Sequence, residues 1–447
     1  MSATPSTDAV IEPVSERTNY AWYVLFLLTF AFTVAFIDRQ VLNLLVEDIK
    51  RDLLLTDTQL SLLQGIAFMG SYIAFSPWFG RWADVGTRRN ILVLGVATWS
   101  IFSALCGFAE TYWQLFLARV AVGAAEASLA PAAWSLIADY FSRERLPRAM
   151  SIYLMGPYIG GGLAMIAGGM VVGSMSTLRE LAPVLADMQP WQLTFIVISV
   201  PGVLLALVLL TIREPARKAP VANSVDRNFS LREVMVFLWR GRAFYVRFYL
   251  GMALIVIVLY ALPAWMPSFL MRVHDADPTR VGLRYGALVL IMGSAGVLSG
   301  PFVDRWLAKR GHIDSPIRTA AIASIGLMIF TASLPLVSGF AGALVVAAGG
   351  TFFYSLPQAM SATALQLATP NRMRGIVTSL YVFVLSVIGL GAAPTVVALV
   401  TDRVFGDPSK VGLSLAVVCA SSAAGAAILL FSSLRHYRLA VEQMRQV

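Results

Sequence analysis

Charged residues are scarce in this sequence, and histidine and cysteine are scarcer still. Asp, Glu, Lys and Arg make up 13% of the 447 residues, and there are only 3 His and 2 Cys. A soluble domain carries about 25% charged residues, so the composition excludes a water-soluble globular protein. Cys106 and Cys419 both lie in apolar stretches, where a thiol behaves as a small hydrophobic group. They support neither a disulfide nor a cysteine-based metal site.

The three histidines lie outside the apolar stretches. His274 and His312 fall in connecting segments, and His436 follows the last stretch. A membrane-embedded enzyme would need its metal ligands, or its nucleophile and base, inside the membrane. We therefore expect no enzyme activity, no metal site and no cofactor.

Hydrophobic residues, in contrast, make up 58% of the chain. A helix needs roughly 20 mainly apolar residues to cross a membrane. A chain in lipid must satisfy its own backbone hydrogen bonds, so we predict α-helices, because the strands of a membrane barrel would show alternating polarity. Twelve spans are predicted, near 20–46, 58–82, 91–108, 112–140, 147–173, 192–212, 243–271, 281–306, 318–336, 340–368, 373–401 and 411–434.

The basic residues indicate how these spans are oriented. The net charge is +9, but Lys and Arg are divided between the two sides of the membrane, so we expect no nucleic acid partner. With the N-terminus inside, most of them fall on the cytoplasmic side. Those on the other side are Lys50, Arg51, Arg179, Arg272, Arg280, Arg284, Arg403 and Lys410. We predict a protein of a bacterial inner membrane, or alternatively of an organelle, with both termini in the cytoplasm.

The longest polar connection lies between spans six and seven, at 213–242. It predicts a bundle of six helices over 1–212, a cytoplasmic linker over 213–242 and a second bundle of six over 243–447. Ser230 and Glu233 have the spacing of a helix capping box before an apolar run. This segment is either an amphipathic helix on the inner membrane surface or a cytoplasmic extension of span seven.

Short motifs repeat between the two halves. Gly80 and Asp84, at the end of span two, recur 220 residues later as Gly300 and Asp304. Three further residues recur 226 positions later: Gly123 as Gly349, Pro131 as Pro357 and Arg148 as Arg374. Together they indicate an all-α membrane protein of twelve helices in two pseudo-symmetric six-helix bundles, as expected of the major facilitator fold.

Residues 80–89 resemble the signature loop of that superfamily, Gly-x-Leu-x-Asp-Arg-x-Gly-Arg-Arg, with Trp82 at the Leu position and Val85 replacing the first Arg. Asp84 could hold the partly positive N-terminus of a neighbouring helix in one of two states. We interpret the segment as a conformational latch, and the alternative is an ordinary basic loop that sets topology. The predicted latch residues are Gly80, Asp84, Gly86, Arg88, Arg89, Asp304, Arg148 and Arg374.

Span five is rich in glycine, with Pro157 between Gly156 and a run that begins at Gly160. It resembles a Gly-Pro motif carried by exporters of the superfamily, and it therefore favours export. Small residues also let any two membrane helices pack closely, which is the simpler explanation. A proline within the span would free a backbone group for neighbouring helices to satisfy.

The most informative ionisable residues inside the predicted spans are Asp38 and Arg39 in span one, and Arg119 and Glu126 in span four. Each such charge costs about 2.5–3.5 kcal/mol, so they should face one another or a wet cavity. Arg247 in span seven lies near the cytoplasmic end and is expected to reach the membrane surface. We predict that Asp38 and Glu126 are proton-coupling residues that exchange Arg119 as their partner. The alternative is a permanent salt bridge between spans one and four, but the second half has no charge at the corresponding positions.

Polar and aromatic residues at mid-depth in the second half could line the other wall of a central cavity, although Tyr and Trp also anchor helices at the membrane interface. They are Tyr260, Trp265, Tyr354, Gln358, Thr378 and Tyr381. As substrate-binding residues we predict Arg39, Arg119, Glu126, Tyr260, Tyr354, Gln358 and Tyr381.

A narrower resemblance covers nearly the whole chain. Ile37-Asp38-Arg39, the run from Arg119 to Ser128, and Ala138-Asp139-Tyr140-Phe141 are similar to motifs of the spinster transporters, with Ala125 in place of a glycine. This resemblance implies a proton-coupled secondary transporter, a monomer, that exports an amphipathic lipid-like substrate such as a lysophospholipid or sphingolipid. The Asp-Arg pair also occurs in organic-anion and sugar-acid symporters, which are the nearest alternative. A channel fits less well, because it would not need the duplicated latches.

Overall fold

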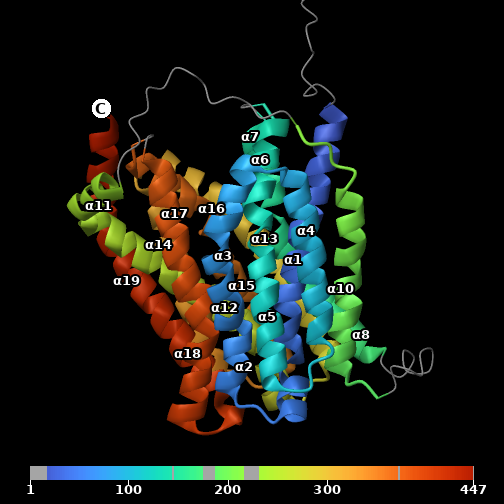
Figure 1. Cartoon of the computed structure of the whole chain (residues 1–447). Helices are drawn as coiled ribbons and strands as arrows, with labels where there is room; N and C mark the ends of the chain where they lie inside the picture. Colours follow the sequence, from blue (N-terminus) through green and yellow to red (C-terminus); the bar gives the residue numbers. More distant parts are fainter. Residues whose placement is uncertain (1–17, 143–144, 175–186, 216–230, 371–372, 446–447) are drawn as a thin grey trace, which may run out of the picture.

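In the computed structural model of the whole chain, the described residues are 18–142, 145–174, 187–215, 231–370 and 373–445. Within these ranges every regular element is a helix. The helices lie side by side in one bundle, and the start of α1 and the end of α19 lie at the same end of it (Figure 1). We name this end the terminal face and the other end the opposite face.

The first half contains α1 (Thr18–Leu53), α2 (Asp57–Gln64), α3 (Ile66–Val85), α4 (Arg88–Cys106), α5 (Tyr112–Glu126), α6 (Leu129–Tyr140), α7 (Leu146–Tyr153), α8 (Gly156–Gly173) and α10 (Pro190–Leu209). A short helix, α11 (Leu231–Arg240), precedes the second half. The second half contains α12 (Arg242–His274), α13 (Pro278–Lys309), α14 (Ser315–Ala332), η3 (Leu334–Leu336), α15 (Phe340–Ser355), α16 (Gln358–Ala368), α17 (Arg374–Leu385), η4 (Ser386–Ala392), α18 (Ala393–Leu399), η5 (Val400–Phe405), η6 (Pro408–Lys410) and α19 (Val411–Arg445).

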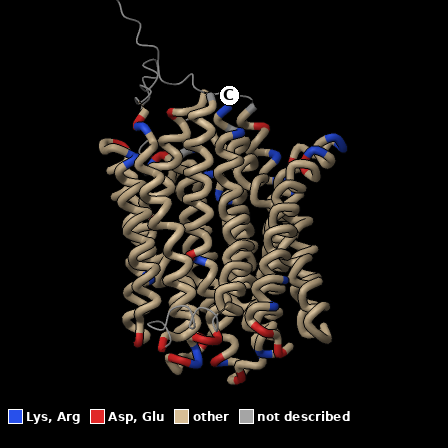
Figure 2. The backbone as a smooth tube through the Cα atoms, turned by 90° about the vertical axis from the view of Figure 1, so that its right-hand side faces the viewer, with Lys and Arg blue, Asp and Glu red and all other residues tan. Residues whose placement is uncertain are grey.

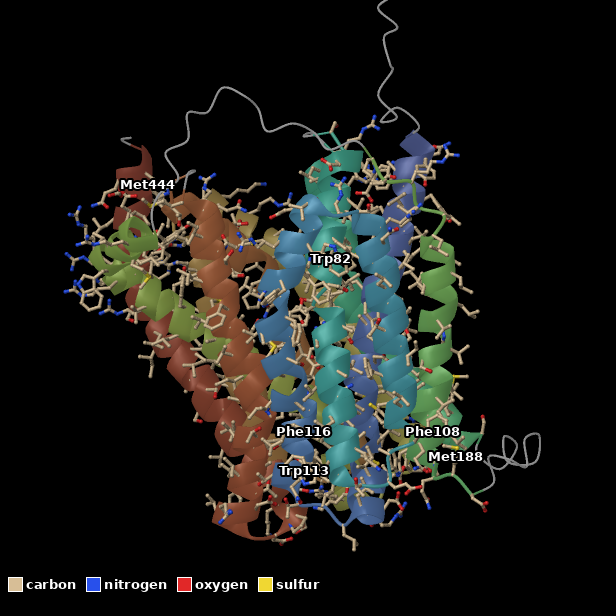
Figure 3. The ribbon with its side chains drawn as sticks, viewed as in Figure 1. Trp82, Phe108, Trp113, Phe116, Met188 and Met444 are labelled. Carbon is tan, nitrogen blue, oxygen red and sulfur yellow. The ribbon has the colours of Figure 1, made fainter. Side chains whose placement is uncertain are left out.

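These elements form 12 helical segments that are long and apolar enough to cross a membrane, which confirms the predicted number of spans. Charged residues gather at the two ends of the bundle, and few lie between them (Figure 2). Large exposed aromatic side chains mark the region near the opposite face, where Phe108 is 60% and Trp113 66% exposed (Figure 3). Aromatic rings in such belts anchor helices at the membrane interface.

Two spans that face each other across the halves are irregular at the same point. Span two breaks at Gly65, between α2 and α3. A Cβ atom at Gly65 would lie 2.7 Å from the main-chain oxygen of Gly391 and 2.9 Å from that of Leu390. Both carbonyls belong to η4, a π-helical stretch of span eleven. Such wide turns are frequent at functional sites, and here only a glycine allows the close approach of the two backbones.

The two halves also pack closely where α8 meets α13. A Cβ atom at Gly162 would lie 2.6 Å from the Cβ of Leu290 and 2.9 Å from the main-chain oxygen of Gly286. The glycine-rich run of span five therefore serves helix packing between the halves. Pro157 lies in the first turn of α8, directly after the interruption of span five between α7 and α8.

The helix α11 lies at the edge of the bundle beside α19 (Figure 1). Val234 is fully buried, whereas Met235, Val236 and Trp239 are exposed. It ends at Arg240, and Gly241 separates it from α12. Ser230 lies outside the described residues, so the capping box stays a prediction, as do the boundaries 1–212, 213–242 and 243–447.

Candidate functional site

The four predicted intramembrane charges lie in the first half, on α1 and α5. The side chains of Asp38, Arg119 and Glu126 are buried, with exposures of 1%, 1% and 0%. Arg39 and Glu126 form an ion pair, in which the Nη2 and Nε atoms of Arg39 lie 2.6 Å and 2.7 Å from Oε2 of Glu126. One oxygen of the carboxylate thus takes both contacts with the guanidinium group, and the hydrogen bond from Nε is charge-assisted, which makes it stronger than one between neutral groups.

Arg119 does not take the partner that we predicted for it. Its Nη1 donates to the main-chain oxygen of Asp38 over 3.3 Å, and the carboxylate of Asp38 accepts a hydrogen bond from the hydroxyl of Ser103 over 2.7 Å. Arg39 takes Glu126 instead. Neighbouring residues on a helix point about 100° apart, so Asp38 faces α4 while Arg39 faces α5.

This cluster leaves three buried polar atoms without a hydrogen-bond partner. They are Oδ2 of Asp38, Nε of Arg119 and Oε1 of Glu126. A buried polar group without a partner destabilises the folded protein by about 1–3 kcal/mol, and a charged group by more. Native structures leave few such atoms, and these three lie on the residues that sequence reasoning selected.

Aromatic rings surround the guanidinium group of Arg39. Its Cζ atom lies 4.5 Å from the ring centroid of Phe68, 4.9 Å from that of Phe36 and 5.2 Å from that of Tyr72. The ring of Phe68 is also 5.7 Å from Cζ of Arg119. Cation–π contacts in a dry environment stabilise a charge by about 2 kcal/mol, so these rings keep two arginines buried near each other. Sequence reasoning missed them, because aromatic residues in membrane helices carry no signal of their own.

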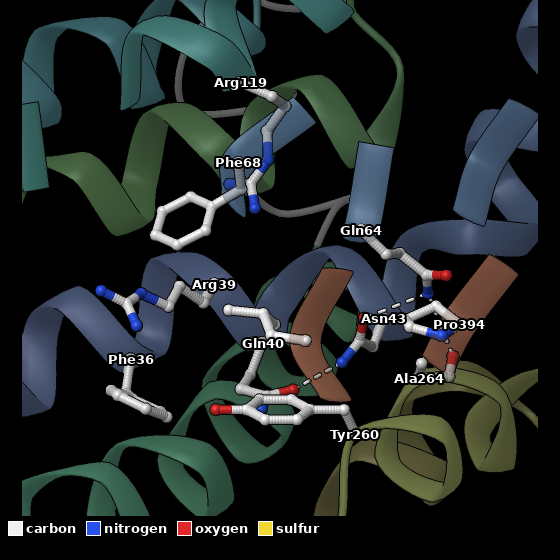
Figure 4. A pocket seen from close by; sticks show the side chains of 11 residues that line it. Phe36, Arg39, Gln40, Asn43, Gln64, Phe68, Arg119, Tyr260, Ala264 and Pro394 are labelled. Carbon is white, nitrogen blue, oxygen red and sulfur yellow. Dashed lines mark hydrogen bonds between the residues drawn. The ribbon is translucent and has the colours of Figure 1, made fainter. Parts of the chain in front are cut away.

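A small cavity lies beside this cluster (Figure 4). It has room for about one water molecule and is lined from both halves of the protein. Its lining residues include the predicted Arg39, Arg119 and Tyr260, and also three amide side chains that were not predicted, Gln40, Asn43 and Gln64.

At the opposite face a second ionic cluster joins the two halves. Arg272 of α12 holds Asp57 of α2 through Nη1 and Nη2, at 2.6 Å and 2.8 Å. Its Nε donates to Glu47 of α1 over 2.9 Å, and Lys50 lies 2.5 Å from the carboxylate of Asp57. We name these four residues the opposite-face gate. Asp402 adds a further bridge by accepting hydrogen bonds from the main-chain N–H and the hydroxyl of Thr58.

The predicted latch residues lie toward the terminal face, where the contacts are looser. The side chain of Asp84 is exposed and that of Asp304 is half-buried, with its Oδ1 unpaired. A Cβ atom at Gly80 would meet nothing within 4 Å, whereas one at Gly86 would lie 2.7 Å from the ring of Trp82. In this conformation Gly80 therefore makes no tight helix contact, and Gly86 is needed for the packing of Trp82.

The arginines of the predicted latch have partners within their own halves. Arg88 is buried and pairs with Asp139 and, at 2.7 Å, with Glu214, and the main-chain N–H of Arg89 also donates to Glu214. In addition, Arg148 lies over the ring of Trp22, and Arg374 donates to the main-chain oxygen of Thr369. Arg88 thus ties α4 to α6 and to the segment after α10.

The other predicted substrate residues of the second half do not line the cavity. The side-chain amide of Gln358 donates to the main-chain oxygen of Tyr354, and Tyr381 packs on Phe248 and Tyr249 of α12. Trp265 is buried and donates from Nε1 to the main-chain oxygen of Pro394 over 2.9 Å, which is a structural contact. Among the described residues, no three His, Cys, Asp or Glu side chains are grouped so that they could hold a metal ion.

Known proteins give an independent view of this arrangement. The family model described as Major Facilitator Superfamily matches residues 28–394. Protein spinster homolog 1 and a sphingosine-1-phosphate transporter, both from Xenopus tropicalis, are 26% and 25% identical to this chain over 85% of it and 73% of their own length. A probable L-galactonate transporter of Escherichia coli is 26% identical over 74% of this chain and 71% of its own length.

A solved structure, of a bacterial homolog to the human lysosomal transporter spinster in an inward-facing and unoccupied conformation, has the same fold. It matches with a TM-score of 0.78 and 24% identity, covering 95% of this chain and 98% of that one. The predicted major facilitator fold and the resemblance to spinster proteins are confirmed. The structure has twelve candidate membrane spans among its described residues, and the family model matches most of the chain. This chain is therefore a membrane protein that belongs to the Major Facilitator Superfamily of transporters.

Proposed function

We propose that this protein is a proton-coupled secondary active transporter that works by alternating access and exports an amphipathic, lipid-like substrate. The observation that carries this proposal is the buried cluster of Asp38, Arg39, Arg119 and Glu126, in which each carboxylate keeps one oxygen unpaired. Burial of ionisable groups inside a membrane protein is costly and marks ion or substrate pathways.

In this mechanism protons are the coupling ion and no cofactor takes part. Oδ2 of Asp38 and Oε1 of Glu126 are the atoms free to receive a proton. Protonation of Glu126 would weaken its pair with Arg39, and the freed guanidinium would then bind an anionic group of the substrate. Arg119, whose Nε has no partner, is the second candidate for that contact.

Alternating access follows from the difference between the two faces. Arg272 and Asp57 close the opposite face in this conformation, and the exposed Asp84 is not engaged at the terminal face. In the other conformation, the gate would open while Asp84 and Asp304 engage helix N-termini. Tyr354, Gln358 and Tyr381 would then be the second-half residues that move toward the substrate.

Support for a lipid substrate comes from the similarity to spinster proteins and from the relative described as a sphingosine-1-phosphate transporter. We therefore propose a lysophospholipid or a sphingolipid. A sugar acid is the second candidate, supported by the relative described as a probable L-galactonate transporter and by the two arginines of the cavity.

We further propose that the terminal face is cytoplasmic, because it carries most of the Lys and Arg residues outside the spans. The membrane would be the inner membrane of a bacterium, and the protein would act as a monomer. A channel would not need a gate and a latch on opposite faces, and a membrane-embedded enzyme would need buried catalytic groups other than these.

Transport by the purified protein in proteoliposomes would test the proposal. Uptake and efflux are measured under an imposed pH gradient, with a radiolabelled lysophospholipid and with galactonate. Efflux of the lysophospholipid that depends on the gradient supports the first candidate, and movement of galactonate alone supports the second. If both substrates move at the same rate with and without the gradient, proton coupling is wrong.

A further inference from the structure

The small cavity has a second polar wall, which the transport mechanism above does not use. It consists of Gln40 and Asn43 of α1 and Gln64 at the end of α2. Nδ2 of Asn43 donates to Oε1 of Gln40 over 2.5 Å, and Nε2 of Gln64 donates to Oδ1 of Asn43 over 3.1 Å (Figure 4). We name these three residues the amide wall.

The orientation of Gln64 in this wall is fixed by its contact with the other half. Its Nε2 also donates to the main-chain oxygen of Ala264 in α12 over 3.1 Å. A main-chain oxygen can only accept, so the amide must present its NH2 group there. The other end of the amide, Oε1, is buried and has no hydrogen-bond partner, and the whole residue is only 7% exposed.

An unpaired buried amide oxygen calls for a hydrogen-bond donor. The charged residues that line the cavity are Arg39 and Arg119, and their positive charges oppose a cationic donor such as an ammonium group. A neutral hydroxyl avoids that repulsion and fits a space that holds about one water molecule. Figure 4 shows Arg39 and Gln64 on different sides of the cavity.

We propose that the amide wall is a specificity subsite that binds a hydroxyl group on the polar end of the transported substrate, with Oε1 of Gln64 accepting the hydrogen bond. This inference rests on the proposed function, since it takes the cavity as part of the transport site. Because the Gln64–Ala264 bond joins the two halves, the subsite is complete only while the opposite face is closed. A hydroxyl bound there therefore favours that conformation.

Binding of two lipids that differ only in headgroup hydroxyls tests this subsite. The probes are lysophosphatidylglycerol and lysophosphatidylpropanol, titrated into the purified full-length protein in nanodiscs. A site built to hydrogen-bond a hydroxyl discriminates strongly against an analogue without one. We expect the wild-type protein to bind the glycerol lipid at least ~10-fold more tightly than the propanol lipid. The Gln64→Met variant should lose this preference, while its affinity for the propanol lipid stays within about twofold of the wild-type value.

Matched variants separate this role from a general loss of structure. Gln192→Met removes a glutamine that donates to the main-chain oxygen of Ala109, away from the cavity, and should keep the preference. Thermal unfolding shows whether each variant is folded. If Gln64→Met does not fold, Asn43→Ala replaces it. This variant removes one of the two bonds that hold Nε2 of Gln64, so the preference should fall at least threefold, roughly the contribution of a single hydrogen bond.

The outcomes distinguish the subsite from the proposed function. If wild type prefers the glycerol lipid and the folded Gln64 or Asn43 variant keeps that preference in full, the subsite is wrong and lipid binding stands. If wild type binds neither lipid, the lipid substrate is wrong, and galactonate and its deoxy analogue then replace the lipids in the same comparison. If those are not bound either, or if wild type binds both members of a pair equally, the subsite is refuted.

Discussion

The two ionic clusters of this protein differ in how completely their charges are paired. In the opposite-face gate, both oxygens of Asp57 accept hydrogen bonds, from Arg272 and Lys50. In the buried cluster, Asp38 and Glu126 each leave one oxygen unpaired. The gate connects two halves of the molecule, whereas the buried cluster belongs to one half.

This difference distinguishes a contact that joins the two halves from the site for which we propose proton binding. Because both oxygens of Asp57 are already paired, this carboxylate gains little from a new ligand, and its bonds to Arg272 hold the two halves together. An incompletely paired cluster gains stability from any proton or polar group that reaches it. Carboxylates and arginines therefore occur in both clusters, and the two clusters differ in how many carboxylate oxygens have a hydrogen-bond partner.

The largest effect is expected from removing the acids of the buried cluster. Asp38→Asn together with Glu126→Gln should reduce transport driven by a pH gradient to background, at least ~100-fold below wild type, because no carboxylate remains there to take a proton. The measurement is uptake and efflux in proteoliposomes with and without the gradient.

Glu110→Gln is the matched control, since Glu110 is an exposed acid in a connecting segment. It should transport like wild type. Unchanged rate and pH dependence in the double variant would contradict the proton site.

Breaking the gate should have the next largest effect. Arg272→Met leaves the fully buried Asp57 without its bidentate partner, and loss of one partner of a buried pair costs about 3–5 kcal/mol. The population should shift away from the conformation described here by at least ~100-fold. Distances between spin labels on the loops of the opposite face measure this shift.

The control for the gate is a surface ion pair on the same face. Arg51 pairs with Asp48 and its side chain is 80% exposed, and such pairs contribute about 0–1 kcal/mol. Arg51→Ala should leave the distances unchanged. Equal shifts in the two variants would show that closure does not depend on the gate.

A smaller effect is expected at the contact between span two and span eleven. In Gly65→Ala the new methyl group would meet main-chain oxygens of η4, which cannot rotate away, and overpacking costs about 1–3 kcal/mol. Opening of the opposite face should increase roughly tenfold or more.

Gly70→Ala is the control in the same span, because a Cβ atom there would meet nothing within 4 Å. Spin-label distances for both variants are compared with wild type. A shift in Gly70→Ala as large as that in Gly65→Ala would mean that glycine flexibility, and not the close approach, matters.

The smallest effect is expected at the terminal face. Asp84 is exposed here, so Asp84→Ala should leave this conformation intact and weaken only the alternative in which the latch engages a helix N-terminus, by about 0.3–1 kcal/mol. The population of the present conformation should rise about twofold to fivefold.

Asp187→Ala is the control, because Asp187 is an exposed acid in another connecting segment, and this variant should not change the population. If Asp84→Ala does not change it either, residues 80–89 are a loop that sets topology and not a latch.

Much of the fold followed from the sequence, because membrane helices are defined by local composition. The number of spans was confirmed, and so was the major facilitator fold, whereas the boundaries of the two bundles stay predictions. The irregular points were not predicted. The break at Gly65 and the π-helical turns of span eleven arise from contact between two backbones, and no single segment contains that information.

The candidate site was predicted only as a set of residues. The cost of burying charge in lipid pointed to Asp38, Arg39, Arg119 and Glu126. The predicted partner of both carboxylates was Arg119, but Glu126 pairs with Arg39 and Asp38 accepts a hydrogen bond from Ser103. Which of two arginines reaches Glu126 depends on how α1 is rotated against α5. Asp57 and Arg272 were missed, because charges at the ends of spans are common and only their pairing makes them unusual.

The sequence by itself determined that this protein spans a membrane twelve times and which costly charges it carries there, since both follow from the energy of transferring residues into lipid. Only the tertiary structure decided which charges are paired and which atoms remain unpaired. Pairing depends on helix rotation and on distances below 4 Å between segments far apart in the chain. The tertiary structure therefore distinguishes the ion pairs that join the two halves from the incompletely paired cluster for which we propose proton binding.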